Sequence, residues 1–157
     1  MKFVNFRAKA VAAESVTVPT TGKVFGGQSV QVGADEIAAT GNTDAYVVAP
    51  QDGRLISVDY SSTGALAVDA TNRVAFTITN LGQAGSGSAA MLDTGAVNST
   101  HSTGGSAITA NARRSLVLHG TAGNLVVEAG DRLRIRAAVS GTISAVAEPV
   151  YVLRFAG

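Results

Sequence analysis

The chain has 157 residues, a length typical of one domain, and no cysteine, which excludes disulfides, thiolate metal sites and cysteine nucleophiles. Apolar residues make up 46% of it and charged residues only 15%, a balance typical of proteins that bury surface against copies of themselves or a partner. The net charge of +1 is lower than is usual for a nucleic-acid binder, and no run of about 18 apolar residues is present that would cross a membrane.

We expect residues 1–43 to form an extended N-terminal arm with the first strands. The opening stretch has basic residues spread through it and no apolar core, so it does not resemble a signal peptide, and we expect the protein to be made and folded in a cytoplasm. The Ala-rich residues 5–15 fit a short helix as well as an extended arm. Residues 33–42 fit a short helical turn that ends at Gly41.

Residues 44–157 have the pattern of an all-β protein. Short runs rich in Val, Ile, Thr and Tyr are separated by Gly, Asn and Asp. About eight to ten such runs predict a jelly-roll-type β-sandwich. In one of them, alternation places Leu55 on one face of the strand and Ile56, Val58 and Tyr60 on the other. The predicted strands are 45–50, 54–62, 72–80, 115–120, 124–131, 132–141, 142–148 and 149–157. Before them, residues 23–33 also alternate as a strand, with a break at Gly26-Gly27.

A Gly/Ser/Thr-rich loop is expected at 82–112 within this domain. Loops of this length in compact domains usually have a function or are mobile. Residues 89–92 and 106–110 inside it also fit short strands, so a decorated hairpin is an alternative. The stretch GQAGSGS at 82–88 lacks the G-K-[ST] ending and the helix of a phosphate-binding loop.

Candidate catalytic and metal-binding residues are few. His101 and His119 have no carboxylate or second histidine at a metal-ligand spacing, and no D-x-D-x-D-G calcium loop or G-x-S-x-G nucleophile elbow is present. We therefore expect no enzyme activity, no catalytic residue and no cofactor, although a calcium site built from distant loops stays open. The few aromatic residues fall mostly within strand runs, which favours a role in the core over stacking on sugars or bases.

Three arginines at alternate positions, Arg132, Arg134 and Arg136, form the most distinctive pattern of the sequence. In a strand they share one face, and Leu133 and Ile135 take the other. A solvated sheet face, a subunit contact and a nucleic-acid groove are all compatible with this stripe.

We expect a subunit contact, because charge is unevenly distributed. Residues 35–112 carry seven acidic and two basic groups, whereas residues 113–157 carry six basic and three acidic groups. Guanidinium groups suit carboxylate partners. The expected partners are Glu128, Asp131 or the acidic middle of the chain, and Arg113 and Arg114 are candidates for the same surface.

The C-terminal stretch VVEAGDRLRIRAAVSGTISAVAEPVYVLRFAG, residues 126–157, resembles the last hairpin of trimeric jelly rolls in phage virion proteins. These include capsid decoration (cement) proteins and fibre heads, and they are similar to the tumour-necrosis-factor-like fold. The stretch YVVAPQDGRLISVDYSSTGAL, residues 46–66, is similar to the opening strands of such domains. Together the resemblance covers residues 45–157.

This resemblance implies a non-enzymatic structural protein on the capsid exterior of a virion. It would form a homotrimer, bind the major capsid protein of an expanded phage capsid and stabilise the shell, with no nucleic acid, membrane or cofactor involved. The N-terminal arm would grip the capsid and add main-chain hydrogen bonds to a neighbouring sheet edge. The expected capsid contacts in the arm are Lys2, Phe3, Phe6, Arg7 and Lys9.

Two other functions stay open at this point. A fibre or tail receptor-binding head of the same fold would use the 82–112 loop to recognise a host surface glycan, although such proteins carry a long trimeric shaft. An enzyme of the cupin or lyase type is the third interpretation, and the lack of a histidine cluster argues against the cupin version.

Overall fold

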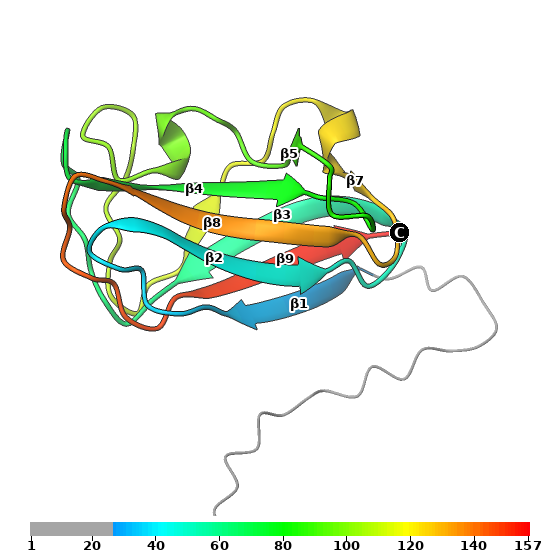
Figure 1. The fold of residues 1–157 in the computed structure, drawn as a ribbon, viewed down its shortest axis with the longest axis horizontal. Coiled ribbons are helices and arrows are strands. Elements are labelled where there is room, and N and C mark those ends of the chain that lie inside the picture. The colour runs from blue at the N-terminus through cyan, green and yellow to red at the C-terminus, as the bar shows by residue number, and fades with distance from the viewer. Residues whose placement is uncertain (1–26) are drawn as a thin grey trace, which may run out of the picture.

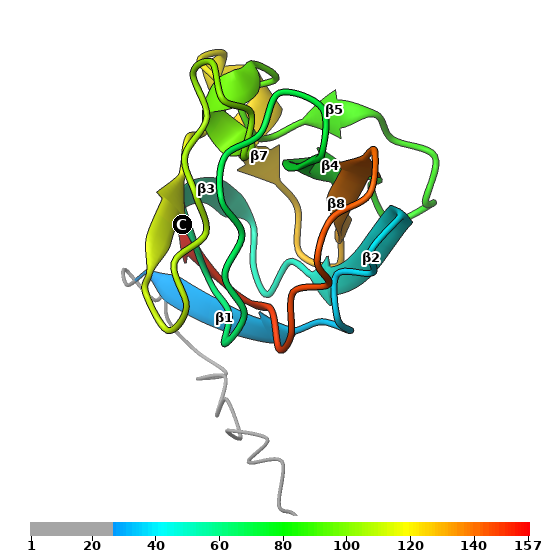
Figure 2. The same ribbon diagram turned by 90° about the vertical axis from the view of Figure 1, so that its left-hand side faces the viewer.

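A computed structural model describes residues 27–157, which form a sandwich of two antiparallel β-sheets (Figures 1 and 2). One sheet has the strand order β1-β9-β3-β6, with β7 also paired to β3, and the other has the order β2-β8-β4-β5. The predicted all-β sandwich is confirmed. The elements are β1 (Gln28–Gly33), β2 (Gly41–Val48), β3 (Gly53–Ser61), β4 (Arg73–Asn80), β5 (Ala89–Ala90), η1 (Ala96–Asn98), β6 (Arg114–Leu116), η2 (Ala122–Leu125), β7 (Val126–Val127), β8 (Arg132–Ser140) and β9 (Val150–Ala156).

The topology is that of a jelly roll. Successive strands β1 to β4 alternate between the sheets, and each half of the chain pairs with the other: β1 with β9, and β2 and β4 with β8. Loops close the ends of the sandwich, and those from β3 to β4 and from β5 to β6 are long. Within residues 27–157 no helix is long and apolar enough to cross a bilayer.

The alternating run expected at residues 23–33 contains the first strand of the described residues. Residues 28–33 form β1, which pairs along its whole length with β9, and the expected boundary between residues 43 and 44 falls inside β2. The helical turn expected at 33–42 is absent, because this segment is extended and bridges Val146 through Ile37. The expected capsid contacts Lys2, Phe3, Phe6, Arg7 and Lys9 lie outside the described residues.

Residues 142–148 do not form the strand that was predicted for them. They connect β8 to β9, and the backbone bonds of Val146 go to Ile37. The loops 62–72, 100–113 and 141–149 lie together at the end of the sandwich that faces the viewer in Figure 2. Backbone hydrogen bonds join them, for example from Thr63 to Ala147 and from Asp69 to Thr100.

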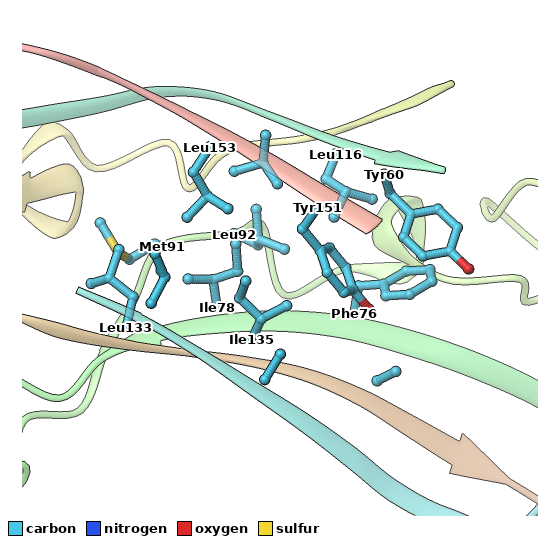
Figure 3. Close-up of a cluster of buried hydrophobic side chains, with 14 of the residues drawn as sticks. Tyr60, Phe76, Ile78, Met91, Leu92, Leu116, Leu133, Ile135, Tyr151 and Leu153 are labelled. Carbon is cyan, nitrogen blue, oxygen red and sulfur yellow. The ribbon is translucent and has the colours of Figure 1, made fainter. Parts of the chain in front are cut away.

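The core lies between the sheets and is built from alternate residues of each strand. Tyr60, Phe76 and Tyr151 form an aromatic cluster at one side of it, with ring centroids 4.7 Å apart for Tyr60–Phe76 and 5.3 Å for Tyr60–Tyr151 (Figure 3). Tilted aromatic pairs of this kind add about 0.5–1.5 kcal/mol beyond the area they bury. Phe155 is also fully buried, so four of the aromatic residues expected in the core are found there, whereas Tyr46 is exposed.

A β-bulge in β3 changes which of its residues face the core. The pairing of β3 with β9 shifts register between Leu55 and Ser57. Because a bulge adds one residue to one strand, Leu55, Val58 and Tyr60 all point inward, and Ile56 is 48% exposed. The alternation predicted for Leu55 and Ile56 was wrong for this reason.

A candidate interaction surface on the outer face of one sheet

The three arginines of the stripe project from the outer face of the four-stranded sheet. Their strand, β8, lies between β2 and β4, so the stripe runs along the middle of that face (Figure 1). Leu133 and Ile135 are buried on the inner face, as the alternation predicts. The β-sheet therefore holds the stripe at fixed spacing on a rigid support.

Arg136 is already paired within its own chain. Its Nε and one terminal nitrogen donate to the two carboxylate oxygens of Asp44, each at 2.7 Å, across the β2–β8 pair. The hydrogen bond from Arg136 lowers the pKa of Asp44, and the same bond raises the pKa of Arg136. A bidentate pair is the strongest arrangement for these groups. Asp44 belongs to the acidic middle region that the sequence offered as a partner, but the sequence did not single it out, because only the strand register places residues 92 positions apart side by side.

Arg132 and Arg134 have no carboxylate partner among residues 27–157. The Arg132 guanidinium lies 5.5 Å from the ring centroid of Tyr46, and the Nε of Arg134 is buried without a hydrogen-bond partner in this part of the chain. Tyr46 and Val48 on β2 are 51% and 56% exposed beside them. We call Tyr46, Val48, Arg132 and Arg134 the arginine face.

The expected carboxylate partners near this strand are engaged elsewhere. The carboxylate of Asp131 accepts hydrogen bonds from the side chain of Asn80 at 2.8 Å and from the backbone of Glu128 at 2.9 Å. Asp131 is buried, so it holds the turn before β8 rather than facing the arginines. Neither Asp131 nor Glu128 forms an ion pair within the described residues.

Arg113 and Arg114 do not join the arginine face, because they belong to the other sheet. Arg113 lies 3.6 Å from the carboxylate of Asp59, which also accepts hydrogen bonds from Arg154 and Ser115, each at 2.7 Å. Burial acts to raise the pKa of Asp59, but the bonds from Ser115 and Arg154 outweigh it, and the pKa is lowered. This cluster ties β3, β6 and β9 together on their outer side.

Arg114 fastens the 82–112 loop to the sandwich. Its guanidinium donates to the carbonyl oxygens of Val97, Ser99 and Ser106 at 2.8–2.9 Å and lies 5.8 Å from the ring centroid of Phe76. Burial lowers the pKa of Arg114. A side chain that satisfies three loop carbonyls from the core side gives this glycine-rich segment a fixed path.

The same loop covers the edge of β4. Ser99 bridges Ala75, and the backbone of Thr100 donates to the carbonyl of Val74 at 2.9 Å, so residues 99–100 pair with the start of β4 while β5 pairs with its end. The short strand expected at 89–92 is present as β5, and the one expected at 106–110 is reduced to a single bridge between Leu66 and Ile108.

The two histidines have local partners. The Nδ1 of His101 accepts a hydrogen bond from the backbone of Thr103 at 2.9 Å, and the Nδ1 of His119 accepts one from Thr121 at 3.0 Å. Across residues 27–157, no three His, Cys, Asp or Glu side chains gather where they would hold a metal ion.

Among the surface hollows of residues 27–157 are two that differ in their lining. The first has a volume of about 400 Å³ and lies where η1 and the 99–103 segment meet the start of β4. The second, of about 270 Å³, is lined by Ser61, Ser62, Thr63, Asn111, Glu148 and Val150. Asn111 and Glu148 have positive φ angles of 59° and 50°, which are uncommon for residues other than glycine.

Comparison with known proteins places the chain in no described family. No family model matches it, and no curated protein matches it. Among solved structures, "Structure of infectious bursal disease virus Gx strain" aligns with 83% of this chain at 11% sequence identity, with a TM-score of 0.40. The chain spans 32% of the length of that chain. A similarity at this level supports no argument about function, which rests instead on the residues of the chain.

Proposed function

We propose that the protein is a structural virion protein that binds the outer surface of an expanded phage capsid and stabilises it as a homotrimer. The observation that carries the proposal is the arginine face, where Arg132 and Arg134, which have no carboxylate partner among residues 27–157, lie beside exposed Val48 and Tyr46 on a rigid sheet. Tyrosine and arginine are enriched at protein interfaces, and in them these residues often dominate the binding energy.

The partner of the arginine face is a second copy of the chain. Charge complementarity supports this assignment, since the acidic middle of the chain has exposed carboxylates at Asp35, Glu36 and Asp52 that form no ion pair among the described residues. A contact between two different surfaces of identical subunits closes into a ring when the rotation between them is a simple fraction of a turn. A trimer is the smallest such ring.

Capsid binding is assigned to the N-terminal arm, with contacts at Lys2, Phe3, Phe6, Arg7 and Lys9. A protein that binds the expanded shell, and not free capsomers, stabilises the shell by mass action. In the proposed mechanism the rigid sandwich trimer spans the contact between neighbouring capsomers, and the arms bind it to the capsid. The resemblance of residues 45–157 to decoration proteins supports this division of roles.

The experiment mixes the purified protein with expanded and unexpanded capsids of its phage and sediments both. The proposal expects co-sedimentation with the expanded form only, and light scattering of the free protein should give about three chains per particle. A variant that lacks residues 1–20 is expected to keep the trimer mass and lose capsid binding. A stable monomer, or equal binding to both capsid forms, would contradict the proposal.

A further inference from the structure

The first hollow has the size and lining of a small-ligand site. Its volume of about 400 Å³ is within the usual range of roughly 300–1,000 Å³ for such sites. Two alanines, Ala75 and Ala96, give it an apolar part, and polar side chains surround them. The lining residues are Arg73, Ala75, Thr94, Gly95, Ala96, Ser99, His101 and Thr103.

Arg73 supplies a guanidinium group that has no ion pair among residues 27–157. One of its terminal nitrogens donates to the carbonyl oxygen of Ala70, which holds the side chain in the lining of the hollow. A guanidinium has five N–H donors, so most of them stay free for a ligand. The planar fork of donors suits a carboxylate, which accepts two parallel bonds.

His101 and two threonines add further hydrogen-bonding groups. The Nδ1 of His101 lies within hydrogen-bond distance of both the backbone N–H of Thr103, at 2.9 Å, and the carbonyl oxygen of Thr103, at 3.1 Å. In the tautomer that accepts from the N–H, the ring hydrogen is on Nε2, which is then a donor for a ligand. The hydroxyl groups of Thr94 and Thr103 donate and accept equally well. Such a mixture suits a ligand that carries hydroxyl groups in addition to its charge.

Two carboxylates, those of Asp69 and Asp93, lie close to the hollow, and one oxygen of each accepts hydrogen bonds from backbone amides. One oxygen of Asp69 accepts hydrogen bonds from the backbone of Asn72 at 2.6 Å and of Thr71 at 2.7 Å. Both bonds lower the pKa of Asp69, and the bond from Asn72 has the larger effect. Asp93 accepts from the backbone of Gly95 at 2.7 Å. Neither carboxylate pairs with Arg73.

The loop that carries these groups is fixed before any ligand arrives. A side chain at Gly105 would collide with backbone atoms of His101 and Ser99, so glycine is needed for the loop to pack behind the histidine. The bonds from Arg114 to Ser99 and Ser106 hold the same loop from the core side. A site that is already in place loses less entropy when it binds.

From this arrangement we propose that the hollow binds a carboxylate-bearing sugar, such as a uronic acid. The carboxylate pairs with Arg73, the ring hydroxyls bond to His101, Thr94 and Thr103, and one face of the ring packs on the two alanines. The site gives the 82–112 loop a role in recognising acidic glycans. It is independent of the proposed capsid function, because it involves neither the arm nor the arginine face.

The test titrates the full-length protein with D-glucuronate and follows backbone amide signals by NMR. Saturable shifts at His101 and Thr103 are expected with glucuronate and not with glucose, which lacks the carboxylate. Inorganic phosphate distinguishes a sugar site from a general oxyanion site, and we expect it to bind more weakly. Absence of saturable binding at tens of millimolar glucuronate, or phosphate binding as tight as that of the sugar, would overturn the proposal.

Substitutions locate the site. Arg73→Gln is expected to lower the association constant for glucuronate by about tenfold or more, since a charge-assisted pair is lost, and Arg73→Lys should restore part of it. Arg54→Gln removes a cation from an exposed position on the other sheet and should leave binding unchanged. Equal affinity of Arg73→Gln and the wild type, in a variant with native amide signals, would show that the sugar binds elsewhere.

Discussion

Arg136 and Asp44 face each other across the β8–β2 pair and share two hydrogen bonds of 2.7 Å. The two strands are far apart in the sequence but adjacent in the sheet, and the two residues are direct partners in the strand register. Both side chains are partly exposed, at 31% and 24%, so water and salt weaken the attraction. The pair therefore helps to fix the register of the sheet more than it adds to its stability.

Replacing Asp44 by Asn is expected to lower the free energy of unfolding at pH 7 by at most about 1 kcal/mol, because the pair is solvent-screened. The pKa of Asp44 in the folded protein is below its ordinary value of 3.8. Its contribution is therefore complete above that ordinary value and is lost as the pH falls through the lower folded pKa. Urea unfolding of wild type and Asp44→Asn from pH 7 to pH 2 should show two stabilities that converge at the acid end.

The control for this prediction is Arg136→Gln, which removes the other partner. Because the effect belongs to the pair, Asp44→Asn should add almost nothing in the Arg136→Gln background. A difference between wild type and Asp44→Asn that stays constant down to pH 2 would contradict the pairing as the source of the shift.

Arg114 is expected to be a major stabilising residue of the 82–112 loop. Arg114→Gln leaves three loop carbonyls short of a charged donor, and we expect a loss of about 2–3 kcal/mol in the free energy of unfolding. The loop should also become sensitive to limited proteolysis. The neighbouring Arg113→Gln is a matched control, because the Arg113 side chain is 68% exposed and should cost less than about 1 kcal/mol. Equal losses in the two variants would argue against the loop-fastening role.

Gly53, the first residue of β3, lies against the backbone at the end of β9. A Cβ atom there would collide with the carbonyl oxygen of Ala156, in the backbone of the last strand, and backbone cannot move aside as a flexible side chain does. Gly53→Ala is expected to destabilise the protein by about 2 kcal/mol or more. Gly33→Ala, on β1, meets no atom within 4 Å and should change the melting temperature little. Melting curves of the two variants compare them directly.

Much of the fold follows from local patterns in the sequence. Alternation in β4 and β8 correctly identifies Phe76, Leu133 and Ile135 as core residues, because these strands pair without irregularity on both sides. The pattern fails at Ile56, where a bulge adds a residue, and bulges depend on the partner strand. It fails again at 142–148, where Ile143 and Val146 are buried but the backbone makes only a single bridge, between Val146 and Ile37, and no strand.

The candidate sites were less predictable, because they depend on contacts between distant segments. The arginine stripe is visible in the sequence, but the pairing of Arg136 with the Asp44 carboxylate depends on the register between two distant strands. The hollow joins Arg73 to residues 94–103 of the 82–112 loop, and neither part carries a recognisable motif. The tight turn at Gly104 and Gly105 was the available signal, since such glycines bring His101 back against the sheet.

The difference between Arg136 and its two neighbours gives a direct test of the subunit contact. Arg132 and Arg134 have no carboxylate within the described part of their own chain, so an intersubunit partner would bond to these two. The double variant Arg132→Ser/Arg134→Ser should lower the particle mass toward that of one chain in light scattering. Arg136→Ser should keep the assembled mass and lower only the unfolding free energy, by up to about 1 kcal/mol. If the double variant assembles as the wild type does, the stripe is a solvated sheet face and the subunits meet elsewhere.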